Sequence, residues 1–489
     1  MKEILTIDQG TTSSRSIIFN DSLEIVHESQ QEYDLFFPKD GWVEANPNDI
    51  LDSVKKTLNT VLGATNSMSN IACCGITNQR ESTIIWEKSS GKAIYPVIIW
   101  QDRRTAELCN KLKQDSGIVK MVSEKTGLLI DPYFSATKIK WILDNVEGAR
   151  KKAENGELAF GTIDSFLIWN LTEEKNHLTD VTNASRTLLY NINSLDWDEE
   201  LLNLFNIPKS LLPNVVASDA AFGKLRFDNN IINITGVLGD QQSAMVGQNC
   251  FDKGSMKSTY GTGCFLMVNT KDEIFRSNSG LLSTIGYQIN GETAYAVEGS
   301  IFSAGTIIQW LRDEMSFFED SRDSEAFIDI NGNTNNLLFI PAFTGLGAPY
   351  WSPNSRGLLS GLTRNTDWKD IVRAVLESVA YQSFDLFKAM NKDGLKPREV
   401  KIDGGMVLNN WFSQFLSDIL DVKVIRPKIN ETTALGAAFV AGLYIGEFKS
   451  LKSISRKWKI DKRFDPKINK SSRIKLLKGW EQAIKRTLI

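Results

Sequence analysis

The sequence predicts an α/β protein of two similarly built domains with a cleft between them. Strand-like and helix-like segments alternate along all 489 residues, which is typical of α/β folds. A strand–turn–strand pattern at residues 3–20 returns at residues 254–269. The chain also exceeds the roughly 100–200 residues of one ordinary domain. We therefore expect a boundary near Gly247, which gives domains 1–247 and 248–489.

The composition argues against several classes of function. The 56 Lys and Arg residues against 59 Asp and Glu residues leave a net charge of −3, whereas a polyanion binder usually carries a basic excess. No apolar stretch long enough for a secretory signal precedes Asp8. The longest weakly polar run, 434–446, is shorter than the about 20 residues of a membrane span. We expect a soluble, cytoplasmic protein with no nucleic-acid partner and no membrane span, and the sequence leaves homo-oligomerisation open.

The few cysteines and histidines narrow the chemistry further. Five scattered cysteines predict buried, reduced thiols rather than disulfides. The two histidines, His27 and His177, lie near no cysteine and far from each other in the sequence. This pattern argues against a structural zinc site and against a Ser-His-Asp hydrolase. Catalysis must then rest on carboxylates, hydroxyls, arginine or a metal held by oxygen.

Two turns rich in Gly and Thr are the first candidates for chemistry. We expect strands at 3–8 and 16–20 around a turn at 9–15, and strands at 254–259 and 264–269 around a turn at 260–263. Backbone N–H and hydroxyl groups in such turns bind phosphate oxygens, and Asp8 beside the first turn could hold Mg²⁺. Either segment alone is also an ordinary turn. One turn in each half can hold a polyphosphate across a cleft, although the chain lacks both a P-loop and a dinucleotide fingerprint.

Three further segments could contribute to a site. Asp240 follows the strand expected at 234–238, where it could accept a proton from an alcohol that attacks a phosphoryl group. A strand at 401–403 leads into two glycines and a helix, which is either a plain turn or a place for a flat ligand. The small residues after 432–433 predict a helix that is either tightly packed core or a hinge at a domain interface.

A second long helix is predicted near residue 370. Asn365 or Thr366 can cap it, its apolar residues recur at helical spacing from Val372 to Leu386, and Gly394 would end it.

Together these elements resemble the actin/hexokinase/heat-shock ATPase superfamily and, within it, the FGGY carbohydrate kinases. The first family pattern is residues 133–145, with Lys138, Trp141 and Asn145 in the expected places. The second is residues 357–362, followed by Asp370, Ile371, Ala374 and Glu377. The segments that resemble the glycerol-phosphorylating members of the family are 8–15, 75–81, 131–135, 239–242 and 341–350. The resemblance covers nearly the whole chain and implies two ribonuclease H-like (actin/hexokinase-type) domains with a catalytic cleft between them.

The resemblance also implies an activity, namely transfer of the γ-phosphate of ATP to glycerol, giving sn-glycerol 3-phosphate. Asp240 resembles the family's general base, and Asp8 with Asp240 would hold Mg²⁺. The glycerol-binding set would be Arg80, Glu81, Trp100, Tyr133, Asp240, Gln241 and Phe265. The phosphates would be bound by Thr11, Thr12, Ser13, Arg15 and Thr262, and the nucleoside end by Gly305, Gln309, Gly405 and Asn409.

Departures from the family and rival interpretations complete the sequence-based prediction. Some relatives bind a sugar bisphosphate through a Gly-rich, Arg-containing loop or are activated at a histidine in that region. Residues 227–230 have neither feature, so we expect neither form of regulation. Two rivals are an FGGY kinase for another polyol or ketose, and a superfamily ATPase without a small acceptor, which would not need Arg80, Glu81, Tyr133 and Gln241. The basic residues between 456 and 486 indicate solvated helix faces or a partner-binding patch.

Overall fold

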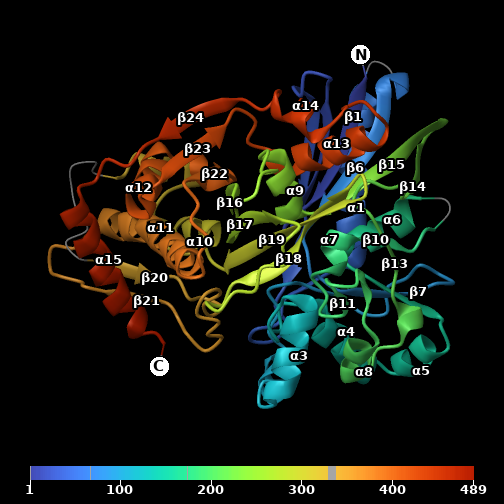
Figure 1. Cartoon of the computed structure of the whole chain (residues 1–489), viewed down its shortest axis with the longest axis horizontal. Coiled ribbons are helices and arrows are strands. Elements are labelled where there is room, and N and C mark those ends of the chain that lie inside the picture. Colours follow the sequence, from blue (N-terminus) through green and yellow to red (C-terminus); the bar gives the residue numbers. More distant parts are fainter. Residues whose placement is uncertain (1, 66–67, 173–174, 329–336, 489) are drawn as a thin grey trace.

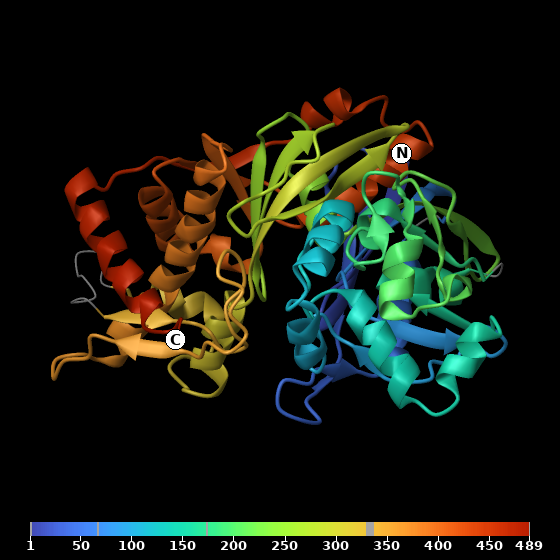
Figure 2. The same ribbon diagram turned by 60° about the horizontal axis from the view of Figure 1, so that its bottom comes forward.

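The chain forms two lobes, each built around one mixed sheet with helices packed against it (Figures 1 and 2). The computed structural model describes residues 2–65, 68–172, 175–328 and 337–488. Figure 1 places the first half of the chain, in blue to green, on the right and most of the second half, in yellow to red, on the left. The last long helix before residue 450 is an exception, because it lies against the first lobe.

The first lobe is organised by a six-stranded sheet in the order β14–β15–β6–β1–β2–β3. Neighbours in β1 to β3 are antiparallel, and β6 and β15 run parallel to β1. The strands are β1 (Glu3–Gln9), β2 (Ser13–Phe19), β3 (Ile25–Glu32), β6 (Ile71–Asn78), β14 (Gly223–Phe227) and β15 (Asn230–Gly239). The helices of this lobe are α1 (Pro47–Ala64), α2 (Ala106–Leu112), α3 (Ser116–Thr126), α4 (Ser135–Asn145), α5 (Ala149–Glu154), α6 (Ile163–Leu171), α7 (Val181–Ala184), α8 (Glu199–Phe205) and α9 (Asp240–Gly247).

The second lobe repeats this plan in a seven-stranded sheet, β18–β19–β17–β16–β22–β23–β24. Strands β19, β17 and β16 are antiparallel neighbours, and β22 and β23 run parallel to β16. The strands are β16 (Met256–Tyr260), β17 (Cys264–Lys271), β18 (Leu282–Ile289), β19 (Glu292–Ile301), β22 (Glu399–Asp403), β23 (Lys423–Pro427) and β24 (Ile460–Phe464). The helices are α10 (Gly305–Asp313), α11 (Trp368–Lys392), α12 (Asn410–Leu420), α13 (Thr432–Tyr444), α14 (Leu451–Ser455) and α15 (Lys470–Lys485).

The shared five-strand arrangement confirms the predicted fold class of two similarly built α/β halves. Three antiparallel strands followed by two parallel ones appear as β3–β2–β1–β6–β15 and as β19–β17–β16–β22–β23. Short strands complete the surroundings: β4 (Leu35–Phe36), β5 (Glu44–Ala45), β7 (Ile84–Glu87), β8 (Val97–Ile98), β9 (Leu158–Gly161), β10 (Leu178–Asp180), β11 (Tyr190–Asn191), β12 (Asp196–Trp197), β13 (Asn214–Val216), β20 (Leu338–Ile340) and β21 (Leu358–Ser360).

Both predicted turns are shorter in the structure than in the sequence-based prediction. Gln9 pairs with Ser14 across the β1–β2 hairpin and β2 begins at Ser13, so only three residues remain in the turn. The N–H of Gly10 closes this turn on the carbonyl oxygen of Ser13 at 2.8 Å. Ser13 and Arg15 therefore lie on a strand rather than in the turn. The second turn is closed in the same manner by Gly261 and Gly263, at 3.0 Å.

The predicted start of α11 was wrong by one or two residues. Asp367, rather than Asn365 or Thr366, caps the helix by accepting from the N–H groups of Lys369 and Asp370. The Asp370 carboxylate in turn accepts from the N–H of Asp367, so two otherwise unpaired donors are satisfied reciprocally. The predicted end was right, because Gly394 follows the helix with a φ of +92°.

Helices α9 and α13 cross at the junction of the two lobes. α13 covers β1, β6 and β15 of the first lobe, and its small residues let these backbones come unusually close. A β-carbon on Gly436 would lie 1.9 Å from the Ser243 carbonyl oxygen, and one on Gly247 would lie 1.9 Å from that of Thr432. The helix is thus tightly packed core at the junction of the two lobes, and its role as a hinge stays a prediction.

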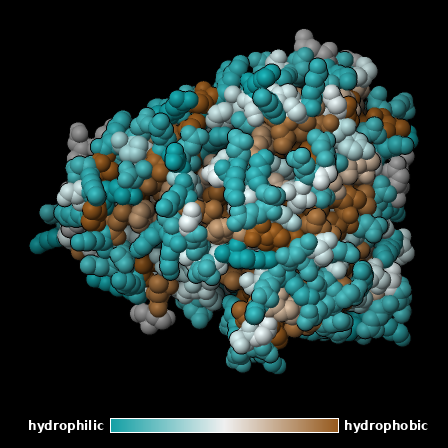
Figure 3. Space-filling view, in the orientation of Figure 1, coloured by the Kyte–Doolittle hydropathy of each residue, from teal (hydrophilic) through white to brown (hydrophobic). Residues whose placement is uncertain are grey.

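The five thiols are buried, and His177 is half-buried between aromatic rings. All five cysteines are free and buried, as predicted. His177 packs edge-on against Trp86 and Trp169, and burial lowers its pKa to about 4. Within the described residues, no helix combines the length and the apolar character that crossing a bilayer requires. Hydrophilic side chains cover most of the face in Figure 3, with apolar ones in small patches between them.

The α9–α13 crossing leads to a prediction about stability. We expect Gly436→Ala to lower the free energy of unfolding by about 3 kcal/mol, because the new methyl group would overlap backbone that cannot move independently. Urea denaturation measures this change. The matched control is Gly63→Ala in α1, where no atom lies within 4 Å of the added carbon, and it should stabilise the protein by about 0.5 kcal/mol. Equal effects of the two substitutions would contradict the close crossing.

Candidate active site

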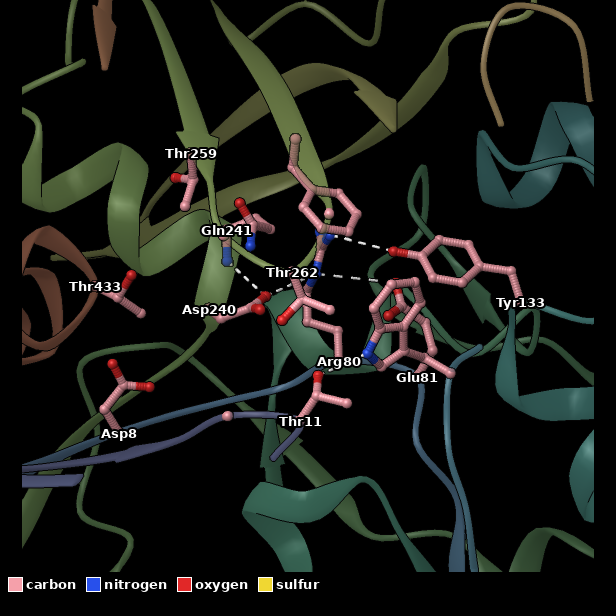
Figure 4. Close-up of a pocket in the computed structure, with 15 residues that line it drawn as sticks. Asp8, Thr11, Arg80, Glu81, Tyr133, Asp240, Gln241, Thr259, Thr262 and Thr433 are labelled. Carbon is pink, nitrogen blue, oxygen red and sulfur yellow. Dashed lines mark hydrogen bonds and ion pairs between the residues drawn. The ribbon is translucent and has the colours of Figure 1, made fainter. Parts of the chain in front are cut away.

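A cavity of about 160 Å³ lies where the two lobes meet. The turns after β1 and β16, the ends of β6 and β15 and the start of α13 all reach it. Figure 4 shows Tyr133 and Glu81 toward one side, Asp8 and Thr433 toward the other, and Asp240 between them. The lining residues are Asp8, Gly10, Thr11, Arg80, Glu81, Trp100, Tyr133, Asp240, Gln241, Thr259, Gly261, Thr262, Gly263, Phe265 and Thr433.

Arg80 is the centre of the end of the cavity formed by the first lobe. It follows β6, a parallel strand, so its side chain starts at the edge of the sheet where ligands bind in α/β folds. Its Nε lies 3.1 Å from Oδ1 of Asp240, its Nη1 2.5 Å from Oε2 of Glu298, and its Nη2 3.4 Å from the hydroxyl of Tyr133. The next residue, Glu81, has a φ of +59°, a strained conformation of the kind that accumulates at functional sites.

Three aromatic rings wall this end of the cavity. The Trp100 ring packs edge-on against Tyr133 and Phe265, with centroid distances of 5.7 and 5.8 Å. The Arg80 guanidinium lies 5.5 Å from the centroid of the Phe265 ring. Trp100 also donates from its indole N–H to the Thr11 hydroxyl at 2.9 Å, which ties the wall to the first turn. The site therefore presents charged groups and apolar faces together.

Asp240 is the first residue of α9 and follows β15 directly. Its Oδ1 accepts from the N–H of Gln241 at 2.7 Å as well as facing Arg80, and 28% of its side chain is exposed. The side chain of Gln241 is held in place by Lys257 of the second lobe, whose Nζ donates to its Oε1 at 2.5 Å. Burial lowers the pKa of Lys257 to about 8. Asp240 thus combines fixed orientation with access to the cavity.

The opposite end of the cavity concentrates negative charge at Asp8. Burial, followed by the charges of Glu431 and Asp240, raises the pKa of Asp8 to about 7, although Arg15 opposes the shift. The two turns line the same cavity as this carboxyl, with Thr11 from one lobe and Thr262 from the other. Such a corner suits a ligand that brings both cations and phosphate oxygens.

Seven of the predicted residues lie outside the cavity lining. Thr12 is exposed, Ser13 accepts from Gln30, and Arg15 pairs with Glu431 of the second lobe. The N–H of Gly305, at the start of α10, donates to the carbonyl oxygen of Gly261 at 2.8 Å, directly behind the second turn. The remaining three, all in the second lobe, are Gln309, Gly405 and Asn409.

Comparison with known proteins identifies the architecture around this cavity. The model of the FGGY family of carbohydrate kinases for the N-terminal domain matches residues 3–247, and that for the C-terminal domain matches residues 256–444. The chain belongs to the FGGY family of carbohydrate kinases. A protein named glycerol kinase from Alteromonas mediterranea is 54% identical over 488 residues, 99% of each chain. Another, from Shewanella piezotolerans, is 51% identical over 490 residues, again 99% of each.

A solved structure agrees with these relatives. The crystal structure of Plasmodium falciparum glycerol kinase with ADP matches with a TM-score of 0.89 and 38% identity, covering 100% of this chain and 99% of that one.

Three charged residues beside the site of this FGGY kinase were not predicted from the sequence. Glu298 and Lys257 lie on the second-lobe strands β19 and β16, and Arg186 follows α7. All three are fully buried beside the predicted site residues. A charged residue inside an otherwise apolar strand is a signal in itself, and the segment Ala294–Ile301 carries one at Glu298. The partners of such a charge remain invisible until the strands are placed.

The carboxylates limit how this kinase could hold a metal. Among the residues that the structure describes, no group of three or more His, Cys, Asp and Glu side chains is arranged to bind a metal ion. Asp8 and Asp240 remain as a pair of oxygen donors facing the turns. A hard cation such as Mg²⁺ commonly takes one or two carboxylates and completes its coordination with water and phosphate oxygens.

The raised pKa of Asp8 leads to a prediction about stability and pH. Ionising Asp8 costs free energy in the folded protein, so we expect Asp8→Asn to stabilise protein kept in EDTA by about 2 kcal/mol at pH 8. The gain should shrink as the pH falls from 7 toward 4, because Asp8 is then protonated in the folded state. Urea denaturation across this pH range measures it. The exposed Asp40, changed to Asn, is the control, and no gain at pH 8 would contradict the electrostatic account.

Proposed function

We propose that the chain phosphorylates a terminal hydroxyl of glycerol with ATP, releasing ADP and sn-glycerol 3-phosphate. The observation that carries the proposal is the position of Asp240, which lies in one cavity between the end at Arg80 and Tyr133 and the end at Asp8. Relatives named glycerol kinase, 51–54% identical over 99% of the chain, support the same substrate, and the solved relative contains ADP.

The size and lining of the cavity favour a small polyol. Its volume of about 160 Å³ is well below the about 300–1,000 Å³ of pockets that take drug-sized ligands. In this proposal Arg80, Glu81, Tyr133 and Gln241 bind the glycerol hydroxyls, and Trp100 and Phe265 contact its C–H groups. Charged side chains held in place by the protein strongly favour a substrate that carries the hydroxyl they bind over an analogue that lacks it.

Asp240 is assigned the role of general base. Its Oδ1 is occupied by Arg80 and by the N–H of Gln241, so we assign proton acceptance to Oδ2. The proton leaves the terminal hydroxyl as its oxygen attacks the γ-phosphate in line. Phosphoryl transfer depends mainly on positioning and charge stabilisation, so one base supported by fixed donors is chemically sufficient.

The two turns and the Asp8 corner are assigned to the phosphates. Asp8 and Asp240 would hold Mg²⁺, and their mutual repulsion, which helps raise the pKa of Asp8, is what a divalent cation relieves. When bound, Mg²⁺ offsets the charge of the phosphate oxygens. The phosphate ligands in this proposal are Thr11, Thr12, Ser13, Arg15 and Thr262. Arg15 would then exchange its present partner, Glu431, for phosphate oxygen.

The nucleoside is assigned to the second lobe, between the start of α10 and the turn after β22. No atom lies within 4 Å of a β-carbon built on Gly405, so the backbone there is open to a flat ligand. Asn409 caps α12 through its Oδ1, while its buried Nδ2 has no hydrogen-bond partner among the described residues. A buried amide N–H without a partner fits a site that a ligand completes. Gly305 and Gln309 would complete this end of the site.

We also propose that the N-terminal domain is 1–247 and the C-terminal domain 248–489, because α9 ends at Gly247 and the sheet of the second lobe begins at Met256. The five free thiols support a reducing, cytoplasmic location.

A coupled assay of ADP release tests the substrate. Glycerol should stimulate ADP release well above the ATPase background and should exceed dihydroxyacetone, xylulose and gluconate in kcat/KM. A larger kcat/KM for a ketose or for gluconate would favour an FGGY kinase with another acceptor. No stimulation by any acceptor in the panel would favour an ATPase without a small-molecule acceptor.

The role of Asp240 is tested separately. We expect Asp240→Asn to lower kcat about 10³-fold, within the range that general-base catalysis supplies, while ADP still binds in calorimetry. The matched control is Asp393→Asn, which removes a carboxylate bonded to Ser277 and Ser279 outside the cavity and should retain turnover. Near-normal turnover by the Asp240 variant would overturn the assignment of the base.

A further inference from the structure

Four buried charges of alternating sign form a ring behind the acceptor end of the cavity. Oε1 of Glu81 accepts from Nε of Arg186 at 2.6 Å, and Nη2 of Arg186 donates to Oε1 of Glu298 at 2.7 Å. Oε2 of Glu298 accepts from Nη1 of Arg80 at 2.5 Å. Nε of Arg80, 3.9 Å from Oε1 of Glu81, closes the ring. Two of the four residues line the cavity and two do not.

The two residues outside the cavity are held as rigidly as those that line it. The side chains of Arg186 and Glu298 are 0% exposed, and their exclusion from the lining means that they do not reach the acceptor themselves. Ser300 donates to Oε1 of Glu298 at 3.0 Å, which adds a third contact to this carboxylate. The Arg186 guanidinium lies 5.7 Å from the Tyr133 ring centroid, so it also backs an aromatic wall.

Burial makes each charge of the ring depend on its neighbours. An ionised side chain is costly in a protein interior unless it is paired, and losing one partner leaves the other charge uncompensated. Arg186 and Arg80 together lower the pKa of Glu298 to about 2 despite its burial. Burial instead raises the pKa of Glu81, and Arg80 and Arg186 oppose that shift. Arg186 therefore favours the ionised form of Glu81.

The ring also joins the two lobes. Arg80, Glu81 and Arg186 belong to the first half of the chain, whereas Glu298 lies on β19 in the sheet of the second lobe. The contact between Arg80 and Glu298 spans 218 positions of sequence. The guanidinium that faces the acceptor is thus fixed by a carboxylate from the other lobe.

We propose that Glu298 and Arg186 are positioning residues for acceptor binding, which hold Arg80 and Glu81 as an ionised, correctly oriented pair. The inference rests on the proposed function. It adds that the acceptor-binding groups adopt their working geometry only when Glu298 of the second lobe contacts Arg80 of the first.

The first test is Glu298→Gln, which keeps the volume of the side chain and removes its charge. We expect the KM for glycerol to rise about 30-fold and the KM for ATP to change less than about threefold. The reason is that loss of the Glu298 charge leaves Arg80 without a partner in the protein interior, and Arg80 then binds the acceptor less well. The kcat/KM advantage of glycerol over propane-1,2-diol and propane-1,3-diol, which each lack one hydroxyl, should shrink. A purely structural defect would lower the amount of active enzyme without changing this advantage.

The matched control is Glu377→Gln in α11. Glu377 is also a buried glutamate bonded to an arginine, Arg373, at 2.9 Å, but it lies outside the cavity lining. This variant should keep the wild-type KM for glycerol. If it matches Glu298→Gln in KM and in discrimination between the diols, the positioning role is overturned.

The ring also predicts how the effects of substituting Glu298 and Arg186 combine. Arg186→Met alone should raise the KM for glycerol about 30-fold, but the double variant with Glu298→Gln removes one charge of each sign and leaves Arg80 with Glu81. Its fold-change should be smaller than the product of the two single fold-changes. If the fold-change of the double variant equals the product of the two single fold-changes, Glu298 and Arg186 act independently and the coupled ring is overturned.

Two further measurements distinguish a failure of the positioning role from misfolding of the variant and from a wrong substrate assignment. If Glu298→Gln does not fold, Ser300→Ala is the milder variant, with an expected rise of about threefold in the KM for glycerol. An unchanged KM in that variant would count against the inference. Wild-type turnover of glycerol is measured in parallel: its absence would overturn the proposed function, whereas normal wild-type turnover with an unaffected Glu298→Gln would overturn the positioning role alone.

Discussion

The crossing of α9 and α13 is the constraint on which the geometry of the site depends. Each helix follows the last parallel strand of the five-strand unit in its lobe, and each begins at the cavity, which Asp240 of α9 and Thr433 of α13 line. Because Gly247 and Gly436 leave no space for a side chain at the crossing, the two helices keep one separation. A third hydrophobic cluster, formed by residues of both lobes around these helices, fixes them further. The packing of the two helices thus fixes how α9, which begins with the proposed base, lies relative to α13.

The same junction places more negative charge near the cavity than the free protein can accommodate without cost. Asp8, Asp240 and Glu431 lie close enough for the last two to raise the pKa of the first. Arg80 lies beside Asp240, and Arg15 is bound to Glu431, so neither arginine fully balances the Asp8 corner. In the proposed function, the divalent cation would bring positive charge beside Asp8 and Asp240, and the donors of the two turns would bind the phosphate oxygens. The raised pKa of Asp8 and the metal binding that we propose there would therefore share one electrostatic origin.

Local patterns in the sequence were sufficient for the two-domain α/β fold, the two turns and Asp240, whereas the family resemblance supplied the lining residues Arg80, Glu81, Trp100, Tyr133 and Phe265. The two Gly-Thr turns and the strand leading to Asp240 are short-range features, and the structure brings them together as the two-domain prediction required. The cap of α11 was misplaced because Asn365, Thr366 and Asp367 are all plausible caps, and only the reciprocal bond with Asp370 separates them. Glu298 and Arg186 could not be found in this way, because their contacts join segments 112 and 218 residues apart. Charge pairs between distant segments produce no repeating pattern along the chain, so they cannot be recognised from residue spacing.

Acceptor binding and phosphate binding are linked through the placement of the lobes. The two turns that we assign to the phosphates come one from each lobe, so a polyphosphate could contact both only when the lobes are close. The contacts of Arg80 also require both lobes to lie close together, because Asp240 and Tyr133 bind it from one lobe and Glu298 from the other. A movement that separated the turns would also release the guanidinium, and the acceptor hydroxyls would lose a donor at the moment the phosphates lost theirs. In the proposed function, this architecture would couple the organisation of the two substrate sites. ATP would then be held for transfer only when the acceptor site is also formed, which would limit transfer of the phosphoryl group to water.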